Sequence, residues 1–414
     1  MPPFRTLESA GLGLMDHGDA RSSDNQPAGD DPSDHVGPGD HSHDGDTALL
    51  ARMRLALVDG IGPRLSQALL ERFGSPAEVF QASEEELQSV PGIGPKLSDA
   101  ILRGRSELDP QEELNACRAA GVAVIARGTP QYPRWLAEIA DPPSIMYVQG
   151  TIKPQDAVAV AIVGSRHATS YGLQTAERLG QALARAGVTV VSGLARGIDA
   201  AAHRGALDAG GRTFAVLGSG LSKIYPPEHQ ALALEVVNQG ALISEMPLRA
   251  DPVSGAFPQR NRIIAGLSLG VVVVEAAFRS GALITARHAM EQNRDVFAVP
   301  GRIDSRLSHG CHQLLRDGAK LVETVDDILE ELGPLPEAAP SASPDGPAVH
   351  KPAELLLNPN EKLVLSVIAE GQATTVDVLI ACTGLAVAQV LTTISVLEMR
   401  RLVKRVGGNA VMRL

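Results

Sequence analysis

The chain of 414 residues has little cysteine, few aromatic residues and no long apolar run. Its three cysteines, Cys117, Cys311 and Cys382, lie far apart and form no Cys-x-x-Cys pair, which argues against a disulfide framework and a cysteine-rich zinc site. No uncharged apolar stretch approaches the roughly 20 residues that a membrane helix needs, and the first residues do not follow the basic-then-apolar order of a signal sequence. We therefore expect a soluble, cytoplasmic protein in a reducing compartment.

Aromatic residues make up only 3% of the chain, which argues against a nucleic-acid platform built from many stacked rings. The net charge of −11 is distributed unevenly. Residues 1–46 hold ten acidic residues against Arg5 and Arg21, a balance of −8, so that −3 remains for the rest of the chain. Residues 160–320 hold fifteen Arg and two Lys against twelve acidic residues, a balance of +5. The middle of the chain therefore remains compatible with a polyanionic partner.

The N-terminal segment 1–46 is rich in Asp, Gly, Ser, Pro and His and has no apolar periodicity. Such a composition cannot bury enough apolar surface to offset the entropy of ordering, so we expect a disordered acidic tail. The pair His41-x-His43 favours solvated side chains over a metal site. We expect no metal and no cofactor in this protein.

The next segment, 47–108, has a helical pattern with an internal repeat. The sequence Gly-Ile-Gly-Pro occurs twice, each time before an amphipathic helix. This order resembles a helix-hairpin-helix element, in which glycines let the backbone approach a DNA phosphate at a helix N-terminus. A SAM-like helical scaffold that uses the same glycines for tight helix crossings also explains the pattern, and the acidic residues 84–86 between the copies favour it over direct DNA contact. The secondary DNA-binding candidates are Gly60, Gly62, Arg64, Gly92, Gly94 and Lys96.

We expect the segment 109–333 to form the core of the protein. From about Asp156 to Gly333 it alternates short Val/Ile/Ala runs with helical stretches. Strands that are apolar throughout are buried on both faces, which predicts an α/β fold with a Rossmann-like, doubly wound parallel sheet. The expected strands are 157–164, 188–193, 213–218, 241–245, 271–276 and 296–300.

The C-terminal part consists of a linker rich in Pro, Ala and Ser, at 334–353, and a final segment, 354–414. The final segment predicts three helices, at 360–369, 375–382 and 387–400, followed by a strand pair around Gly407-Gly408-Asn409, which is the order of a winged helix. The third helix carries cations only at its end, Arg400 and Arg401. We therefore favour protein interaction over DNA reading for this domain.

Motifs for nucleotide chemistry are missing or incomplete. No P-loop occurs, and Gly218-Ser219-Gly220 lacks the third glycine of a dinucleotide fingerprint. The match to Gly-x-Ser-x-Gly at 266–270 precedes a strand, the reverse of a nucleophile elbow. His309-Gly-Cys311-His312 has no second cluster and predicts a loop contact. We identify no catalytic residue.

Polar residues do follow the predicted strands, where doubly wound folds bind ligands. Arginine outnumbers lysine in this region, which suits bidentate phosphate recognition. The candidate DNA-binding residues are Gly164, Ser165, Arg166, Arg196, Lys223, Phe257, Arg260, Asn261 and Arg262.

Seven ordered blocks over roughly residues 130–332 carry a family resemblance: VAIVGSR, VVSGLARGIDAAAH, AVLGSGL with YPPEH, LISEMP, FPQRNRIIAGLS, VVVVEA with SGALITARHA, and VFAVPGR. They resemble the DprA (Smf) family of DNA-processing proteins. One departure is the segment SHGCHQLLRDGA, where the family pattern leads us to expect an Asn near His312. The resemblance implies a non-enzymatic protein that binds and protects single-stranded DNA in natural transformation, dimerises, and loads the RecA recombinase. It implies DNA at Gly164, Ser165 and Arg166.

Two further expectations concern function and assembly. The alternative function is a nucleotide phosphoribohydrolase of the lysine-decarboxylase-like family, with Glu275 and Ser280-Gly281 in the catalytic segment. That alternative lacks the required Pro-Gly-Gly-x-Gly-Thr loop. For the homodimer, the candidate apolar surface is Val325-x-x-Ile328-Leu329.

Overall fold

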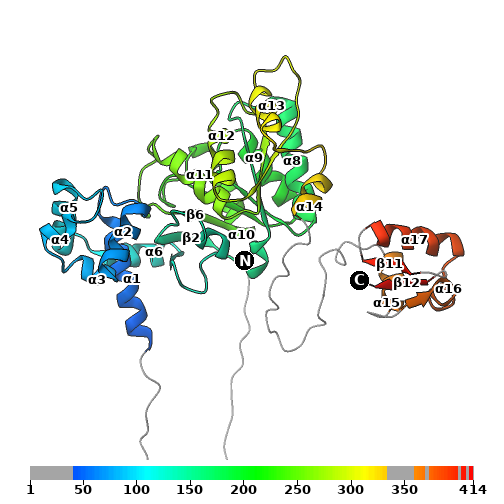
Figure 1. The fold of residues 1–414 in the computed structure, drawn as a ribbon, viewed down its shortest axis with the longest axis horizontal. Helices are drawn as coiled ribbons and strands as arrows, with labels where there is room; N and C mark the ends of the chain where they lie inside the picture. Colours follow the sequence, from blue (N-terminus) through cyan, green and yellow to red (C-terminus); the bar gives the residue numbers. More distant parts are fainter. Residues whose placement is uncertain (1–40, 333–358, 369–372, 400–401, 407–409, 414) are drawn as a thin grey trace, which may run out of the picture. The chain divides into compact units, whose positions relative to one another are not determined.

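The computed structural model describes residues 41–332, 359–368, 373–399, 402–406 and 410–413. Figure 1 colours the chain from the N-terminal helices in blue, through the α/β core, to the C-terminal helices and strands in red. The helical, α/β and winged-helix parts confirm the expected fold class. The linker expected at 334–353 and the turn at 407–409 lie outside the described residues.

The N-terminal part is helical, as the sequence predicts. Helix α1 begins at His41, within the segment 1–46 that we expected to be disordered. The helices of this part are α1 (His41–Leu57), α2 (Pro63–Phe73), α3 (Pro76–Val79), α4 (Glu84–Gln88) and α5 (Pro95–Glu107).

The two Gly-Ile-Gly-Pro copies pack against each other reciprocally. Gly60 has φ +85°, and a Cβ at this position would lie 2.8 Å from Leu97 of the second copy. Gly92 has φ +92°, and its Cβ would lie 2.9 Å from Leu65 of the first copy. Both glycines are therefore required by backbone conformation and by the close approach of the copies. This packing supports the scaffold explanation for Gly60 and Gly92.

The core contains a nine-stranded sheet in the order β1-β2-β6-β5-β4-β3-β7-β8-β9. Strands β3 to β9 all run parallel to one another, whereas β2 pairs antiparallel with β6, and β1 antiparallel with β2. The strands are β1 (Val122–Ala126), β2 (Ile145–Gly150), β3 (Ala159–Gly164), β4 (Thr189–Ser192), β5 (Thr213–Val216), β6 (Ala241–Ser244), β7 (Gly270–Val274), β8 (Asp295–Ala298) and β9 (Lys320–Leu321).

The six predicted strands correspond to β3 to β8, with ends that differ by a few residues. The prediction missed β1, β2 and β9. The helices of the core are α6 (Pro110–Ala119), α7 (Arg134–Ala137), α8 (Ser170–Arg185), α9 (Ile198–Asp208), α10 (Gln230–Gln239), α11 (Ala256–Gly266), α12 (Gly281–Glu291), α13 (His309–Arg316) and α14 (Val325–Leu332), with short 3-10 turns η1 (Pro154–Ala157) and η2 (Pro227–His229).

Helices cover both faces of the parallel strands, because alternate residues of each strand point to opposite faces. In β3, Ala161 and Val163 join a cluster with residues of α11, α12 and α13. Val160 and Ile162 join a second cluster with residues of α8, α9 and α14. Figure 1 shows α8 and α9 on one side of the sheet, with α11 and α12 on the other. The strands are therefore buried on both faces.

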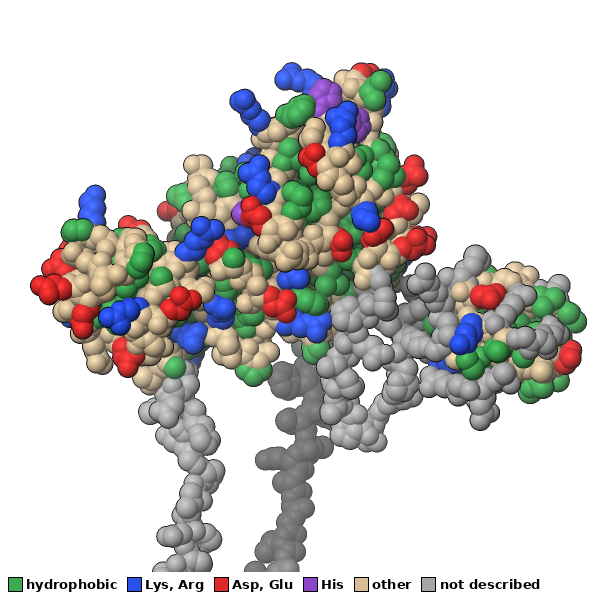
Figure 2. Space-filling view, in the orientation of Figure 1, with side chains coloured by type: hydrophobic (Ala, Val, Ile, Leu, Met, Phe, Trp, Pro, Cys, Tyr) green, Lys and Arg blue, Asp and Glu red, His purple; other side chains and the backbone are tan. Residues whose placement is uncertain are grey.

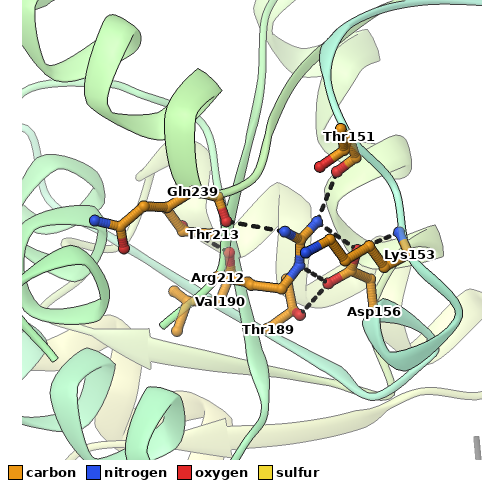
Figure 3. A network of polar contacts seen from close by, with 8 residues as sticks. All are labelled: Thr151, Lys153, Asp156, Thr189, Val190, Arg212, Thr213 and Gln239. Carbon is orange, nitrogen blue, oxygen red and sulfur yellow. Dashed lines mark hydrogen bonds and ion pairs between the residues drawn. The ribbon is translucent and has the colours of Figure 1, made fainter. Parts of the chain in front are cut away.

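A network of hydrogen bonds and an ion pair connects residues at the amino ends of β3, β4 and β5 (Figure 3). Arg212, just before β5, donates to both carboxylate oxygens of Asp156, at 2.5 Å and 2.7 Å. The Asp156 carboxylate also accepts from Thr189 Oγ1 of β4 at 2.7 Å and from the backbone amide of Lys153 at 2.7 Å. Arg212 additionally reaches the carbonyl of Thr151. This ion pair therefore connects the segments that precede β3 and β5, at the amino ends of the strands. The predicted DNA-binding loops follow the carboxyl ends.

The packing of α14 contradicts the expectation that Val325, Ile328 and Leu329 form an apolar dimer surface. Ile328 is fully buried, and Val325 and Leu329 pack against the cluster under α8 and α9. The apolar side of this helix therefore covers the core of its own chain. It offers no free apolar face for a second copy.

The C-terminal part consists of α15 (Pro359–Val367), β10 (Ala373–Thr375), α16 (Val376–Thr383), α17 (Val387–Met399), β11 (Val403–Val406) and β12 (Ala410–Arg413). Its three-stranded sheet has the order β10-β12-β11, and the prediction missed β10. Across the described ranges, we find no helix that is both long enough and apolar enough to cross a membrane.

Candidate nucleic-acid interface

A small cavity lies where the loops that follow β3, β4 and β5 meet the start of α11. Its volume is about 20 Å³. Four of its eight lining residues are predicted DNA-binding residues. We call the cavity the arginine pocket, lined by Arg166, Gly193, Ala195, Arg196, Tyr225, Pro226, Phe257 and Arg260.

Arg166 stands on the loop between β3 and α8. Gly164 ends the strand, and the buried Ser165 accepts a hydrogen bond at its Oγ from the amide of His167 at 3.1 Å. Thr169 caps α8 by accepting at its Oγ1 from the Gly172 amide. The loop is therefore held at both ends, and Arg166 between them is exposed to solvent.

Two aromatic rings form a wall of the arginine pocket. The Arg166 guanidinium carbon lies 5.5 Å from the Phe257 ring centroid. The Phe257 and Tyr225 centroids are also 5.5 Å apart, with the ring planes tilted by 45°. Both distances fall in the range of favourable cation–π and ring–ring contacts.

Arg196, on the loop after β4, is partly neutralised by the protein itself. Its Nε lies 2.5 Å from Glu228 Oε1, and both side chains are about half exposed, at 48% and 50%. The hydrogen bond with Glu228 raises the pKa of Arg196, and it lowers the pKa of the Glu228 carboxyl. An incoming phosphate must therefore compete with Glu228 for Arg196.

Arg260 lies at the base of the arginine pocket and is almost fully buried, with 5% of its surface exposed. Burial lowers its pKa to about 10, and the nearby Asp199 opposes this effect. Arg260 donates through Nη1 to the carbonyl of Val216, but its Nε has no partner among the described residues. A buried cation with an unused donor favours an added anion.

The Asp199 side chain binds the backbone of the loop between β4 and α9. Its carboxylate accepts from the amides of Gly193 at 3.1 Å and Ala195 at 3.4 Å. Burial raises the pKa of this carboxyl, whereas Arg260 and the two amides act in the opposite direction. Asp199 thus holds the backbone of the β4 loop against the pocket.

Five of the nine predicted residues do not line the arginine pocket. Gly164 and Ser165 belong to the segment that carries Arg166, and the other three have partners elsewhere. Arg262 is buried and pairs with Glu245 and with Asp141, at 3.7 Å from the latter. Asn261 donates to the carbonyl of Gly281, at 3.3 Å, on the neighbouring helix. Lys223 is half exposed and lies 3.5 Å from Asp251. Arg260, Asn261 and Arg262 thus do not converge on one cavity, because neighbouring residues of a helix point in different directions.

The sequence analysis did not include several residues at the site, among them Tyr225, which lines the cavity, and Glu228 and Asp199, which contact its lining. Tyr225 and Glu228 lie in the block YPPEH, which carried part of the family resemblance. Asp199 follows Arg196 within the block VVSGLARGIDAAAH. These ordered blocks were the signal that could have pointed to them.

Charge on the visible face of the core is mixed. Figure 2 shows basic side chains around its upper rim, with acidic side chains more frequent toward α14. Helix α14 itself carries Asp326, Asp327, Glu330 and Glu331. This face of the core is therefore not uniformly basic.

The secondary DNA-binding candidates of the N-terminal part lie at or near the N-termini of α2 and α5. Gly62 and Gly94 precede α2 and α5, with no side-chain cap and open space around each. Lys96 is exposed, whereas Arg64 lies 3.7 Å from Asp141. These ends retain free amides that suit an anion.

His312 makes the loop contact that the sequence predicted. Its Nε2 lies 3.0 Å from the carbonyl oxygen of Gly301. No group of three or more potential metal ligands occurs among the described residues.

Family models match all three parts of the chain. The model described as DNA recombination-mediator protein A matches residues 123–333. A SAM-like helix-hairpin-helix tandem matches residues 53–105, and a DprA winged helix domain matches residues 334–409. The central model alone covers half of the chain.

Individual relatives agree with these matches. Protein Smf of Synechocystis is 35% identical over 86% of this chain and 96% of that protein. DNA processing protein DprA of Streptococcus pneumoniae is 46% identical over 48% of this chain and 71% of that protein. The X-ray structure of the pneumococcal protein has a TM-score of 0.59 and 35% identity, covering 68% of this chain and 95% of that one.

A solved structure from Helicobacter pylori describes the single-stranded DNA binding mode of its DNA processing protein A. It is 30% identical and has a TM-score of 0.46, covering 51% of this chain and 95% of that one. The family models and the relatives matched over most of their length establish that this chain belongs to the DprA (Smf) family of DNA-processing proteins.

Proposed function

We propose that this protein binds single-stranded DNA through the arginine pocket and acts as a recombination mediator without catalysing a covalent reaction. The observation that carries the proposal is the convergence of Arg166, Arg196 and Arg260 on one cavity. The three cations come from three separate segments of the chain. Guanidinium groups bind phosphate oxygens through paired N–H donors, so this arrangement suits a sugar-phosphate backbone.

The size of the cavity favours phosphate over base recognition. A volume of about 20 Å³ accepts a water-sized group such as a phosphate oxygen, but not a nucleobase. Phe257 and Tyr225 stand beside the cations and offer one place for a base to stack. The proposed binding is therefore led by phosphates, with little reading of base identity.

A flexible strand fits this geometry better than a duplex. Arg166 and Arg196 follow the carboxyl ends of the neighbouring strands β3 and β4, and Arg260 reaches the same cavity from α11. A single strand of DNA can bend so that successive phosphates reach these cations. A stiff duplex cannot follow the same path. We propose that the protein protects such strands during natural transformation and loads RecA onto them, in the cytoplasm, as a homodimer. The description of the matching family as a recombination mediator supports this role.

The competing phosphoribohydrolase function receives little support from the residues around Glu275. Its carboxylate accepts hydrogen bonds from the backbone amide and the hydroxyl of Thr169, and so it is engaged within the protein. Incubation with nucleoside monophosphates tests this alternative. Release of free base would establish an enzyme.

A binding comparison tests the main proposal. The full-length protein should shift an oligo-dT strand at lower concentration than a duplex of equal length. Light scattering at micromolar concentration should report a dimer. RecA assembly on a fluorescent strand should accelerate when the protein is present. Equal affinity for both DNA forms would contradict the proposal.

A further inference from the structure

The strand order of the sheet reverses next to β3. Strand β4 lies on one side of β3, and β7, which comes much later in the sequence, lies on the other. Helix α8 follows β3 and helix α12 follows β7, so two helices begin beside this point. Doubly wound sheets generally bind ligands in the crevice at such a switch point, with phosphates facing helix N-termini.

In this protein a side chain of the chain itself occupies that position. Glu275 directly follows β7 and is only 7% exposed. Its Oε2 accepts from the amide of Thr169 at 2.8 Å, and its Oε1 accepts from the Thr169 hydroxyl at 2.5 Å. Thr169 is the residue that caps α8. The carboxylate therefore sits at the N-terminus of the helix after β3.

The backbone and the neighbouring glycine are both adapted to this side chain. Glu275 has φ +57°, in the left-handed region that residues other than glycine seldom adopt. A Cβ on Gly172, in the first turn of α8, would lie 2.4 Å from Glu275 Oε2. The carboxylate thus fills the space beside the first turn of α8 and also accepts the hydrogen bonds of Thr169 at the start of this helix.

We propose that Glu275 is a specificity-determining residue whose carboxylate takes the place of a ligand phosphate at the switch point. The carboxylate excludes inorganic phosphate and mononucleotides because it already accepts the hydrogen bond of the Thr169 amide and because its negative charge repels another anion. It also holds the loop from Ser165 to Thr169, so that Arg166 projects toward the adjacent arginine pocket. Only this last consequence rests on the proposed function. DNA phosphates then bind one strand away from the usual ligand position.

The direct test is Glu275→Gly, because glycine accepts the left-handed backbone while removing the carboxylate. The full-length variant should bind dTMP and inorganic phosphate at least tenfold more tightly than wild type, as measured by isothermal titration calorimetry. Phosphate should also shift the Thr169 amide signal in NMR spectra of the variant. A stable, folded Glu275→Gly protein without either change would overturn the proposal.

Two further variants complete the test. Asn293→Gly changes another left-handed residue, with φ +54°, outside the crevice, and it should leave phosphate binding unchanged. Glu275→Gln removes the charge with little change in shape, and it should tighten phosphate binding severalfold. If Glu275→Gly fails to fold, an unchanged affinity in Glu275→Gln contradicts the inference.

Parallel titrations with oligo-dT separate this inference from the proposed function. Wild-type protein that binds oligo-dT, together with variants that gain no phosphate binding, would refute the role of Glu275 alone. Variants that gain phosphate binding, together with wild-type protein that does not bind oligo-dT, would refute the DNA-binding function alone.

Discussion

The guanidinium of Arg166 lies over the ring of Phe257, with 5.5 Å between the guanidinium carbon and the ring centroid. Arg166 comes from the loop after β3 and Phe257 from the first turn of α11, so folding brings together residues that are far apart in the sequence. The ring limits the positions that the cation can adopt. We therefore expect Arg166 to meet a phosphate in a defined place, beside a surface on which a base can stack.

Arg166→Ala should weaken binding to oligo-dT and reduce its salt dependence. If three arginines neutralise about three phosphates, log K should fall with log salt at a slope of about −2, from about 0.7 per phosphate of a single strand. The variant should lose about one such contribution. A salt titration followed by fluorescence anisotropy measures both quantities.

Arg185→Ala provides the matched control, because Arg185 is an exposed cation in the last turn of α8, outside the arginine pocket. Its removal should change the affinity and the slope less than Arg166→Ala does. Identical slopes for wild type and Arg166→Ala would contradict the assignment of Arg166 to a phosphate.

Phe257→Ala should lower the affinity without changing the salt slope, because a ring stacks on bases and neutralises no phosphate. The expected cost is about 1–3 kcal/mol for one stacked base. The double variant Arg166→Ala/Phe257→Ala should show coupling of about 0.5–1 kcal/mol, because each side chain supports the other. Strictly additive losses would mean that the observed contact does not contribute to binding.

Glu228→Gln should strengthen binding to single-stranded DNA and steepen the salt slope. The Glu228 carboxylate now lies 2.5 Å from Arg196 Nε and competes with phosphate for this cation. Asp304→Asn removes a carboxylate from another exposed pair, with Arg302 at 2.8 Å, outside the pocket, and should have little effect. Binding that weakens in Glu228→Gln would show that Glu228 supports the site instead of competing at it.

Asp156→Asn should destabilise the fold and leave the DNA affinity of the folded protein unchanged. The Asp156 side chain is 1% exposed and its partner Arg212 is 14% exposed, so the substitution leaves a poorly compensated buried cation. Loss of one member of such a pair costs about 3–5 kcal/mol. Urea unfolding measures the cost, and Asp99→Asn, in an exposed pair with Arg103, should stay within about 0.5 kcal/mol of wild type. A similar midpoint for both variants would refute the prediction.

The buried His203 should make the fold less stable in acid. Its side chain is fully buried, with Nδ1 2.7 Å from Thr213 Oγ1, and burial lowers its pKa from 6.5 to about 3. Between these pH values the unfolded chain binds a proton that the folded protein does not. This contribution to stability is therefore complete above about pH 6.5 and is lost as the pH falls, by up to about 1.4 kcal/mol per pH unit.

Urea midpoints between pH 7.5 and pH 4.5 measure this effect. His203→Asn keeps a polar group near the position of Nδ1 but has no titrating ring, so the variant should lose this part of the pH dependence. The difference between the two proteins isolates His203 from the other groups that titrate in this range. Parallel curves for both would exclude His203 as the source.

Much of the core followed from the sequence, for a definite physical reason. Strands β3 to β8 lie under helices on both faces, so they appear in the sequence as short uninterrupted apolar runs. The antiparallel strand β1 is only partly buried, with buried residues at its two ends alone, and β9 has only two residues, both exposed. Such short or half-exposed strands carry no comparable signal, which explains why they were missed.

The sequence by itself determined the order of the strand-end loops and the residue types that they carry, including Gly-Ser-Arg after the first parallel strand. Tertiary structure alone decided which of these side chains meet. Arg260 and Arg262 are two residues apart on α11, yet the first lines the arginine pocket and the second pairs with Glu245. A turn of about 100° per residue separates their directions, and only the elements packed around the helix determine what each one reaches.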